Sequence, residues 1–348
     1  MSFLYFAVIE MNIQFSKNHT ALLKFYFILT VTAFHILRDV YKLPIMHSYG
    51  VVGFFIISGY GCYFSLQSKS FKSFIKSRFA FIAFPYYIAL FFYIIAHFFF
   101  GFYNPNTPLV RDIWGIIAHI FFIHNITGYT QWTISGVLWF IAPIMQLYFL
   151  SFWLKKFIDF NKYLPIIAII FIFVCAYLIK YFYGIRNLYF YGGWHIIYLA
   201  PFLSGMILAK YHQPLFTFLS THFKNIFIFI TYILITLFFT YKTIYSSNII
   251  TMSLVLLLSI PFLLYLCKII ENFISSKTIT FLGTFSFFIY LYNYAFLVFK
   301  PIFKFDDKLV KTLVYFLITL LVAFFFYIIN KQLPTIFSKI KRKLKYSQ

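Results

Sequence analysis

The chain has 348 residues, of which 63% are hydrophobic and only 10% charged, and its formal net charge is +22. In a water-soluble domain about a quarter of the residues are charged, so this composition excludes an ordinary soluble fold. The apolar residues instead form runs of about 17–25 residues, each long enough to cross a hydrocarbon core about 30 Å thick. We therefore expect an all-α, polytopic transmembrane helix bundle that forms a single domain over residues 1–348.

About ten spans are predicted along the chain. A sliding window of about 19 residues places them near residues 21–37, 49–66, 80–101, 137–154, 163–180, 194–210, 225–241, 248–267, 283–299 and 310–330. A short lead (1–20) precedes the first span and a basic tail (331–348) follows the last. The apolar stretch from Ile113 to Thr127 is shorter. It is either a re-entrant or interfacial helix, or half of an eleventh span.

The distribution of Lys and Arg predicts that both termini are cytoplasmic. With the N-terminus inside, the cytoplasmic segments hold 18 of the 29 basic residues and the outer segments hold 10, while Lys24 lies in the first span. The excess of positive charge belongs inside. Because the basic residues lie between apolar runs, they indicate orientation and contact with anionic lipid headgroups. No nucleic-acid partner is expected.

The first predicted span carries the most informative pair of polar residues, Lys24 and His35. Eleven positions at 100° per residue make three turns plus about 20°, so both side chains face the same way, about 16 Å apart along the axis. Asp39 follows His35 by one turn, where a carboxylate can orient the imidazole. Two alternatives stay open: Lys24 extends to the inner headgroups, and His35 bonds to a neighbouring helix.

Further along the chain, polar residues have both a structural and a functional interpretation. Arg78 ends a basic run that the orientation rule explains by itself, and it is also a candidate anion ligand. Ser286, Tyr290 and Asn293 recur at i, i+4 and i+7, which predicts a polar stripe on one helix face. Such a stripe either lines a tunnel or bonds to neighbouring helices.

Other residues with chemical potential give weaker signals. Trp139 is either an anchor at the membrane interface or part of a pocket. His124 and His195 are expected to be solvated near the outer face. The three cysteines lie far apart in apolar runs, at Cys62, Cys175 and Cys267. Their spacing predicts neither a metal site nor a disulfide framework.

Five segments resemble a known family. They are the Lys24 to His35 pair, SYGVVGFFIISGYGCYFS (48–65), SFKSFIKSRFAFIAFPYYIAL (70–90), VLWFIAPIMQLYF (137–149) and LGTFSFFIYLYN (282–293). In this order they are similar to motifs of the membrane acyltransferase family 3, whose members O-acylate surface polysaccharides, lipopolysaccharide, peptidoglycan or small glycosides. The chain departs from the family pattern at Lys24, which stands in place of Arg, and at Asn293, where His is usual.

The resemblance implies an O-acyltransferase in the cytoplasmic membrane of a bacterium, with multiple spans. Its donor would be acetyl-CoA or another acyl-CoA on the cytoplasmic side, and no cofactor is expected to be bound permanently. The acceptor would be a hydroxyl of a polysaccharide, a lipopolysaccharide or a lipid-linked sugar. The alternative is a polysaccharide exporter or flippase on the same scaffold. The seven acidic residues lie near span ends or in loops, which disfavours an ion-coupled transporter.

The resemblance also assigns roles to residues. Lys24 and Arg78 would bind the donor phosphates, and His35 would act either as general base or as the nucleophile that carries the acyl group. The spacing along the first span adds Asp39 as the residue that orients His35. A substrate tunnel would be lined by Trp139, Ser286, Tyr290 and Asn293.

Overall fold

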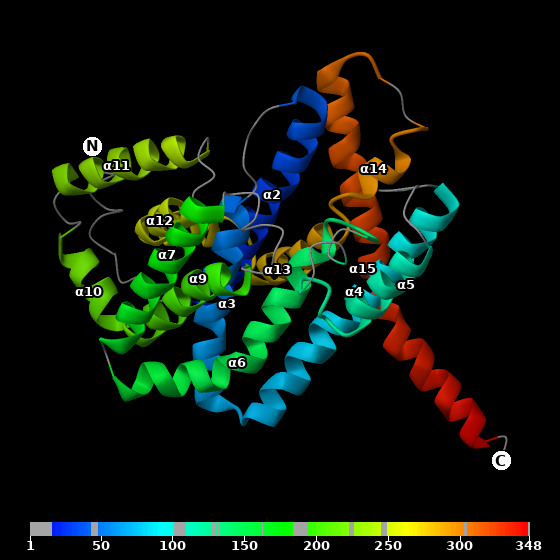
Figure 1. Cartoon of the computed structure of the whole chain (residues 1–348), viewed down its shortest axis with the longest axis horizontal. Helices are drawn as coiled ribbons and strands as arrows, with labels where there is room; N and C mark the ends of the chain where they lie inside the picture. Colours follow the sequence, from blue (N-terminus) through cyan, green and yellow to red (C-terminus); the bar gives the residue numbers. More distant parts are fainter. Residues whose placement is uncertain are drawn as a thin grey trace.

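The structure is a computed structural model. It describes residues 16–42, 48–100, 109–126, 130, 133–161, 163–183, 194–222, 226–244, 249–302 and 305–346. Within these ranges every regular element is a helix (Figure 1), which confirms the expected all-α class for the described part of the chain.

The helices follow the predicted apolar runs closely. They are α2 (Lys17–Tyr41), α3 (Ser48–Ser68), α4 (Phe71–Phe100), α5 (Leu109–Ile120), the 3-10 turn η2 (Leu138–Phe140), α6 (Ile141–Phe160), α7 (Leu164–Tyr183), α9 (Trp194–Lys210), α10 (His212–His222), α11 (Ile226–Ile244), α12 (Ile249–Glu271), α13 (Ser276–Leu291), α14 (Ala295–Phe299) and α15 (Lys308–Tyr346). Two kinds of exception occur: the ninth predicted run is divided between α13 and α14, and the short helices α5 and α10 lie outside the ten predicted spans.

Several of these helices are suited to cross a bilayer. Among the described residues, six helices are long and apolar enough to span, over Lys17–Tyr41, Tyr49–Ser68, Phe71–Phe99, Leu138–Phe160, Met252–Glu271 and Lys308–Leu333. Two further apolar helices are shorter, over Leu164–Cys175 and Tyr198–Lys210. The chain is therefore a multi-pass membrane bundle. The count of about ten spans and the cytoplasmic position of the termini remain predictions.

Helix α2 is the central scaffold of the bundle. It begins where it does because Ser16 caps it: the Ser16 hydroxyl accepts from the amide of His19 at 3.1 Å, and His19 Nδ1 accepts from the Ser16 amide at 3.2 Å. It ends at Lys42, which adopts a left-handed conformation with φ 57°. Between these ends α2 packs against α3, α12, α13 and α15. This central position fixes the orientation of its polar side chains.

Helices α3 and α9 approach each other closely because each places a glycine at the crossing. A Cβ atom on Gly59 would lie 1.9 Å from the carbonyl oxygen of Phe202, and a Cβ atom on Gly205 would lie 1.9 Å from the carbonyl oxygen of Ile56. Small residues allow such backbone contact in membranes, where dispersion and weak polar contacts drive helix association. The two glycines thus hold α3, the helix of Cys62, against α9.

We expect Gly59→Val and Gly205→Val each to lower the midpoint of thermal unfolding in detergent by several degrees or to abolish the folded peak in gel filtration. The added side chain would meet backbone, which cannot rotate away. Gly61→Ala, two residues from Gly59 on the same helix, is the matched control, because the nearest neighbour of its Cβ lies 4.0 Å away. Equal stability of Gly59→Val and Gly61→Ala would contradict the close crossing.

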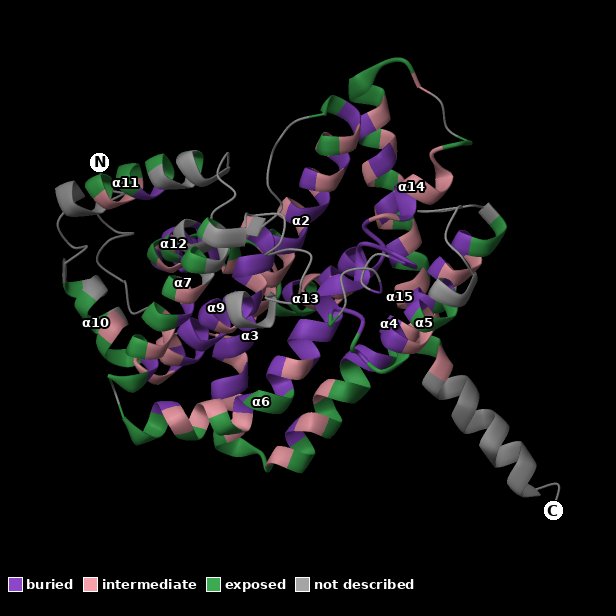
Figure 2. Cartoon of the chain, viewed as in Figure 1, coloured by how far each residue is buried: buried purple, intermediate pink, exposed green. Residues whose placement is uncertain are grey.

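The outward surface of the bundle is apolar. Figure 2 shows buried residues gathered at the centre and exposed ones on the outer helices. Large apolar side chains are exposed on α4, α7, α11 and α15, for example Phe91, Phe171, Leu237 and Phe325. Water would penalise so much exposed apolar surface, whereas lipid chains accept it. These helices therefore present their outer faces to the membrane.

Helix α5 (Leu109–Ile120) covers part of the short apolar stretch for which the sequence allowed either a re-entrant or interfacial helix or half of a span. Its 12 residues reach about 18 Å, so it does not span the bilayer. Its polar residues Asp112 and His119 are buried, whereas Ile113, Trp114 and Ile120 are exposed. This arrangement is the reverse of a helix on a soluble protein, and it indicates a short helix whose apolar side faces lipid.

Candidate active site

Lys24 and Arg78 come together at one end of the bundle. Lys24 is half-buried on α2, and the positive charge of Arg78 on α4 acts on its ammonium group. Both cations also act on the thiol of Cys62, a fully buried residue of α3. Three consecutive helices, α2, α3 and α4, thus place two positive charges around one buried residue.

Arg78 is half-buried against the bundle, unlike the exposed lysines Lys72 and Lys76 that precede it on the same helix. Its Nη2 lies 3.3 Å from the Ser65 hydroxyl, and its guanidinium carbon lies 5.3 Å from the ring centres of both Phe74 and Tyr148. The neighbouring Lys72 is exposed. The orientation rule alone therefore does not account for the position of Arg78.

The two cations have no acidic counterpart in the ion pairs of the described residues, since neither Lys24 nor Arg78 takes part in one. Like charges held close together in a partly buried place repel each other and lower the stability of the fold. An anionic ligand would remove this penalty. The arrangement is therefore suited to bind phosphate or another anion.

His35 lies three turns further along the same unbroken helix. Its side chain is half-buried, and its ring packs edge-on against Tyr294 with the ring centres 4.7 Å apart. The unbroken course of α2 from Lys17 to Tyr41 maintains the helical spacing between Lys24 and His35 on which the prediction rested.

The chain breaks its helix beside His35. Helix α13 ends at Leu291 and α14 begins at Ala295, so Asn293 and Tyr294 lie in a turn within a run that the sequence predicted as one span. Asn293 is fully buried, and neither atom of its amide has a hydrogen-bond partner. Interrupted helices within membrane proteins occur where the backbone lines a cavity or a binding site. The buried amide of Asn293 precedes Tyr294, whose ring packs on His35, and a polar ligand group could supply the hydrogen bonds that this amide lacks.

The other predicted tunnel residues do not form one stripe. Asn293 is not on the helix that carries Ser286 and Tyr290, so the prediction of a common face for all three is wrong. The Ser286 hydroxyl donates to the Gly283 carbonyl of its own helix at 2.8 Å. Tyr290 donates to the Val137 carbonyl next to η2.

Trp139 is buried in η2 rather than exposed at an interface, and its ring centre lies 5.5 Å from that of Tyr198. Trp139 lies on η2, and the Tyr290 hydroxyl of α13 donates to the Val137 carbonyl just before η2. This burial disfavours the interpretation of Trp139 as an anchor at the membrane interface, and its role in a pocket stays a prediction.

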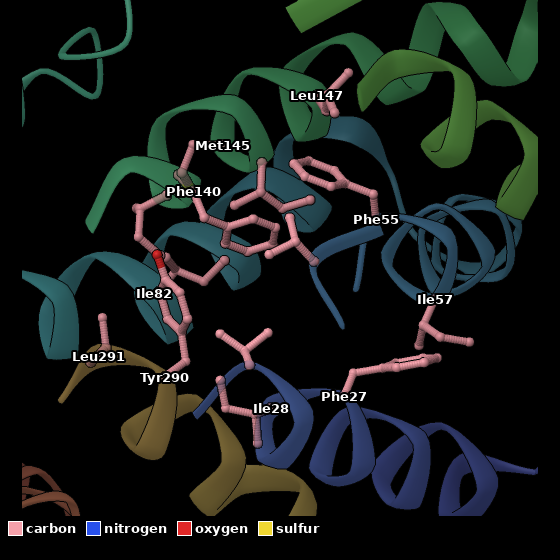
Figure 3. Close-up of a cluster of buried hydrophobic side chains, with 14 of the residues drawn as sticks. Phe27, Ile28, Phe55, Ile57, Ile82, Phe140, Met145, Leu147, Tyr290 and Leu291 are labelled. Atoms are coloured by element: carbon pink, nitrogen blue, oxygen red, sulfur yellow. The ribbon is translucent and has the colours of Figure 1, made fainter. Parts of the chain in front are cut away.

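Apolar side chains lie along α2 between Lys24 and His35. Ile28 and Val31 lie on the same side of the helix as Lys24 and His35, and both are buried. They belong to the hydrophobic cluster that also contains Phe140 and Tyr290 (Figure 3). The stretch between the cation pair and the imidazole is thus apolar.

Asp39 contacts a distant lysine. Lys300, which follows α14, donates to Asp39 Oδ1 at 2.7 Å, and the ammonium group of Lys42 lies 3.9 Å from the same oxygen. The carboxylate is mostly buried, with 15% of its side-chain surface exposed. Asp39 therefore links the end of α2 to the segment that follows α14 through its ion pair with Lys300.

Comparison with known proteins identifies the family. A family model described as an acyltransferase domain matches residues 19–329, which include every candidate residue above. The chain belongs to the membrane acyltransferase family 3. In the same comparisons neither a curated protein nor a solved structure matches the chain. The resemblance inferred from the motifs is thereby confirmed, and the protein is a membrane acyltransferase.

The acyltransferase also contains buried polar residues that the sequence did not single out. His97 on α4 and Asp112 on α5 approach to 3.3 Å, and both are nearly inaccessible. His124 was expected to be solvated, which is wrong: it is fully buried and stacks on His119 with ring centres 3.9 Å apart. The side chain of His195 lies outside the described residues. Asp112 and His119 share one face of α5 at i and i+7, a spacing that would have revealed this cluster.

We expect Asp39→Asn and Lys300→Gln to reduce the activity of the acyltransferase through the same contact. A double-mutant cycle measured by thermal unfolding and by turnover should give a coupling of about 1 kcal/mol, so that the double variant is little worse than either single one. Additive losses would show instead that Asp39 acts on another group, such as His35.

Proposed function

We propose that this protein is an acyl-CoA-dependent O-acyltransferase of a bacterial cytoplasmic membrane. It moves an acyl group, in the simplest case acetyl, from cytoplasmic acyl-CoA to a hydroxyl of a cell-surface or exported glycan. The proposal rests on family membership together with a site that has an anion-binding end and an imidazole end on one helix.

The observation that carries the proposal is the cation pair of Lys24 and Arg78, which stands without an acidic counterpart in the described ion pairs. Acyl-CoA carries several phosphates at one end and its thioester at the other end of a long flexible arm. Charge-assisted hydrogen bonds from Lys and Arg are the usual means of holding phosphate. The phosphates would bind between Lys24 and Arg78, and the arm would extend along α2.

His35 then meets the thioester at the far end of the arm. As general base it takes the proton of the glycan hydroxyl, whose oxygen attacks the thioester carbon. The C–S bond breaks, and the CoA thiolate receives the proton from the imidazolium. In the alternative course the imidazole attacks the thioester carbon, the C–S bond breaks and CoA leaves as its thiolate. The glycan hydroxyl then takes the acyl group from the imidazole, and its proton passes to the thiolate. Both courses balance without a metal or a redox cofactor.

The apolar stretch formed by Ile28 and Val31 supports a site in which Lys24 and Arg78 bind the donor and His35 performs the transfer. A thioester that reaches His35 through apolar surroundings is kept from bulk water, which would otherwise hydrolyse it. Asn293 is placed to bond a polar group of the bound substrate, because its amide is buried and unsatisfied.

The test is acyl transfer by the purified protein in proteoliposomes. Acetyl-CoA labelled in its acetyl group is supplied with envelope glycans from a strain that lacks the gene, and labelled glycan is quantified by mass spectrometry. The proposal predicts labelled product that depends on both donor and acceptor. Movement of a lipid-linked glycan across the membrane without any donor, and without labelled product, would favour an exporter and refute the proposal.

A further inference from the structure

The His35 end of the bundle carries more cations than carboxylates among the described residues. We use "His35 end" for the last turns of α2, for α14 and for the first turns of α15. Its described cations are Arg38, Lys42, Lys300, Lys308 and Lys311, against the carboxylates Asp39, Asp306 and Asp307. On the predicted orientation this end faces outward, where the orientation rule disfavours an excess of Lys and Arg. Another reason for the positive charge is needed.

These side chains gather at one place. Lys308 lies over the ring of Tyr41 at 5.8 Å, and Lys300 binds Asp39, so α14 and α15 bring their cations to the end of α2. Figure 1 shows α14 and the beginning of α15 beside that end. The local carboxylates are already used in part, since Asp39 binds Lys300 and Asp307 caps α15 by accepting from the amide of Val310 at 2.7 Å.

Arg38 is the cation closest to the proposed chemistry. It lies one turn beyond His35 on α2 and is exposed. Its charge acts on Tyr294, the residue whose ring packs against His35. It takes part in none of the ion pairs of the described residues. The guanidinium carbon of Arg38 lies 5.9 Å from the ring centre of Phe34, the residue before His35, and the exposed guanidinium group can still donate hydrogen bonds to a ligand.

From this juxtaposition we infer that the acceptor is an anionic glycan, and that Arg38 binds a carboxylate or phosphate of the sugar that is acylated or of its neighbour. The guanidinium group presents paired donors that match such a group. The distance between Arg38 and His35, about one helical turn, limits the anion to that sugar or the next. This inference rests on the proposed function, because it names the substrate class of the same site.

The inference is tested by binding alone, without a donor. The full chain in nanodiscs is titrated with tetragalacturonate, with a glycerol-phosphate oligomer and with carboxyl-reduced tetragalacturonate as the neutral control. We expect the wild type to bind an anionic probe more tightly than the neutral one. Arg38→Gln should weaken only the anionic probe, by about fivefold, and Arg38→Lys should retain most of the preference. Lys331→Gln, an exposed lysine at the other end of the α15 span, is the matched control and should change nothing.

Phospholipid headgroups offer the same anionic chemistry, so every titration is repeated in discs of zwitterionic lipid and in discs with anionic lipid. The inference predicts the same loss in both. It is overturned if the wild type does not prefer an anionic probe, if Arg38→Gln weakens anionic and neutral probes equally, or if the loss appears only with anionic lipid. Failure of acyl transfer with intact anion-selective binding would refute the proposed function instead.

Discussion

Replacing His35 by alanine should reduce acyl transfer by at least about 100-fold while leaving the fold and the binding of acyl-CoA intact. A positioned general base contributes about 10²–10⁴-fold to a rate, and loss of a covalent nucleophile costs at least as much. His35 is half-buried and its ring packs edge-on against Tyr294, so its replacement removes little of the buried core. Turnover of labelled acetyl by the purified variant is the measurement.

The control for His35 is His212→Ala. His212 is another half-buried histidine, which packs against Phe64 at the beginning of α10. It should retain near-normal turnover. Full activity of His35→Ala with an unchanged pH dependence would remove His35 from the mechanism, whichever of its two roles is considered.

The second large effect is expected at the cation pair. Lys24→Gln and Arg78→Gln should each raise the KM for acetyl-CoA by about 10- to 100-fold, which corresponds to the loss of one charge-assisted hydrogen bond. The double variant should lose less than the product of the two, because removing one cation relieves its repulsion of the other. Lys24→Arg should retain donor binding, since it keeps the charge and adds the planar donor group.

The matched control for the cation pair is Lys72→Gln. Lys72 is an exposed member of the same basic run that leads to Arg78, so it removes equal charge without touching the site. Its KM should be unchanged. A fall in kcat without a rise in KM in both Lys24→Gln and Arg78→Gln would mean that the pair serves structure and not donor binding.

The parts of the fold that the sequence predicted correctly depend on local periodicity. Apolar runs marked the helices because lipid contact requires apolar length, and helical spacing placed Lys24 and His35 on one side of α2. Such signals need no knowledge of neighbouring helices. The helices and the shared side of α2 could therefore be predicted from the sequence alone.

The parts that were missed depend on contacts between distant segments. The break at Asn293 follows an apolar stretch without Pro or Gly nearby, so hydropathy predicted a single span from residue 283 to residue 299. Lys300 reaches Asp39 across 261 positions, and no local pattern predicts that pairing. The burial of His124 likewise depends on η2, whose Leu138 carbonyl lies 3.1 Å from its ring nitrogen. Hydropathy shows which segments prefer lipid to water, but it does not show which segments contact each other.

The most direct test of the account is the sidedness of the reaction. Acetyl-CoA is sealed inside proteoliposomes, the glycan acceptor is supplied only outside, and molecules with the opposite orientation are inactivated by an impermeant reagent. The account predicts labelled glycan outside, since one helix connects the donor-binding cations to the imidazole at the other end. Product that forms only after the vesicles are permeabilised, or only when donor and acceptor share one side, would contradict it.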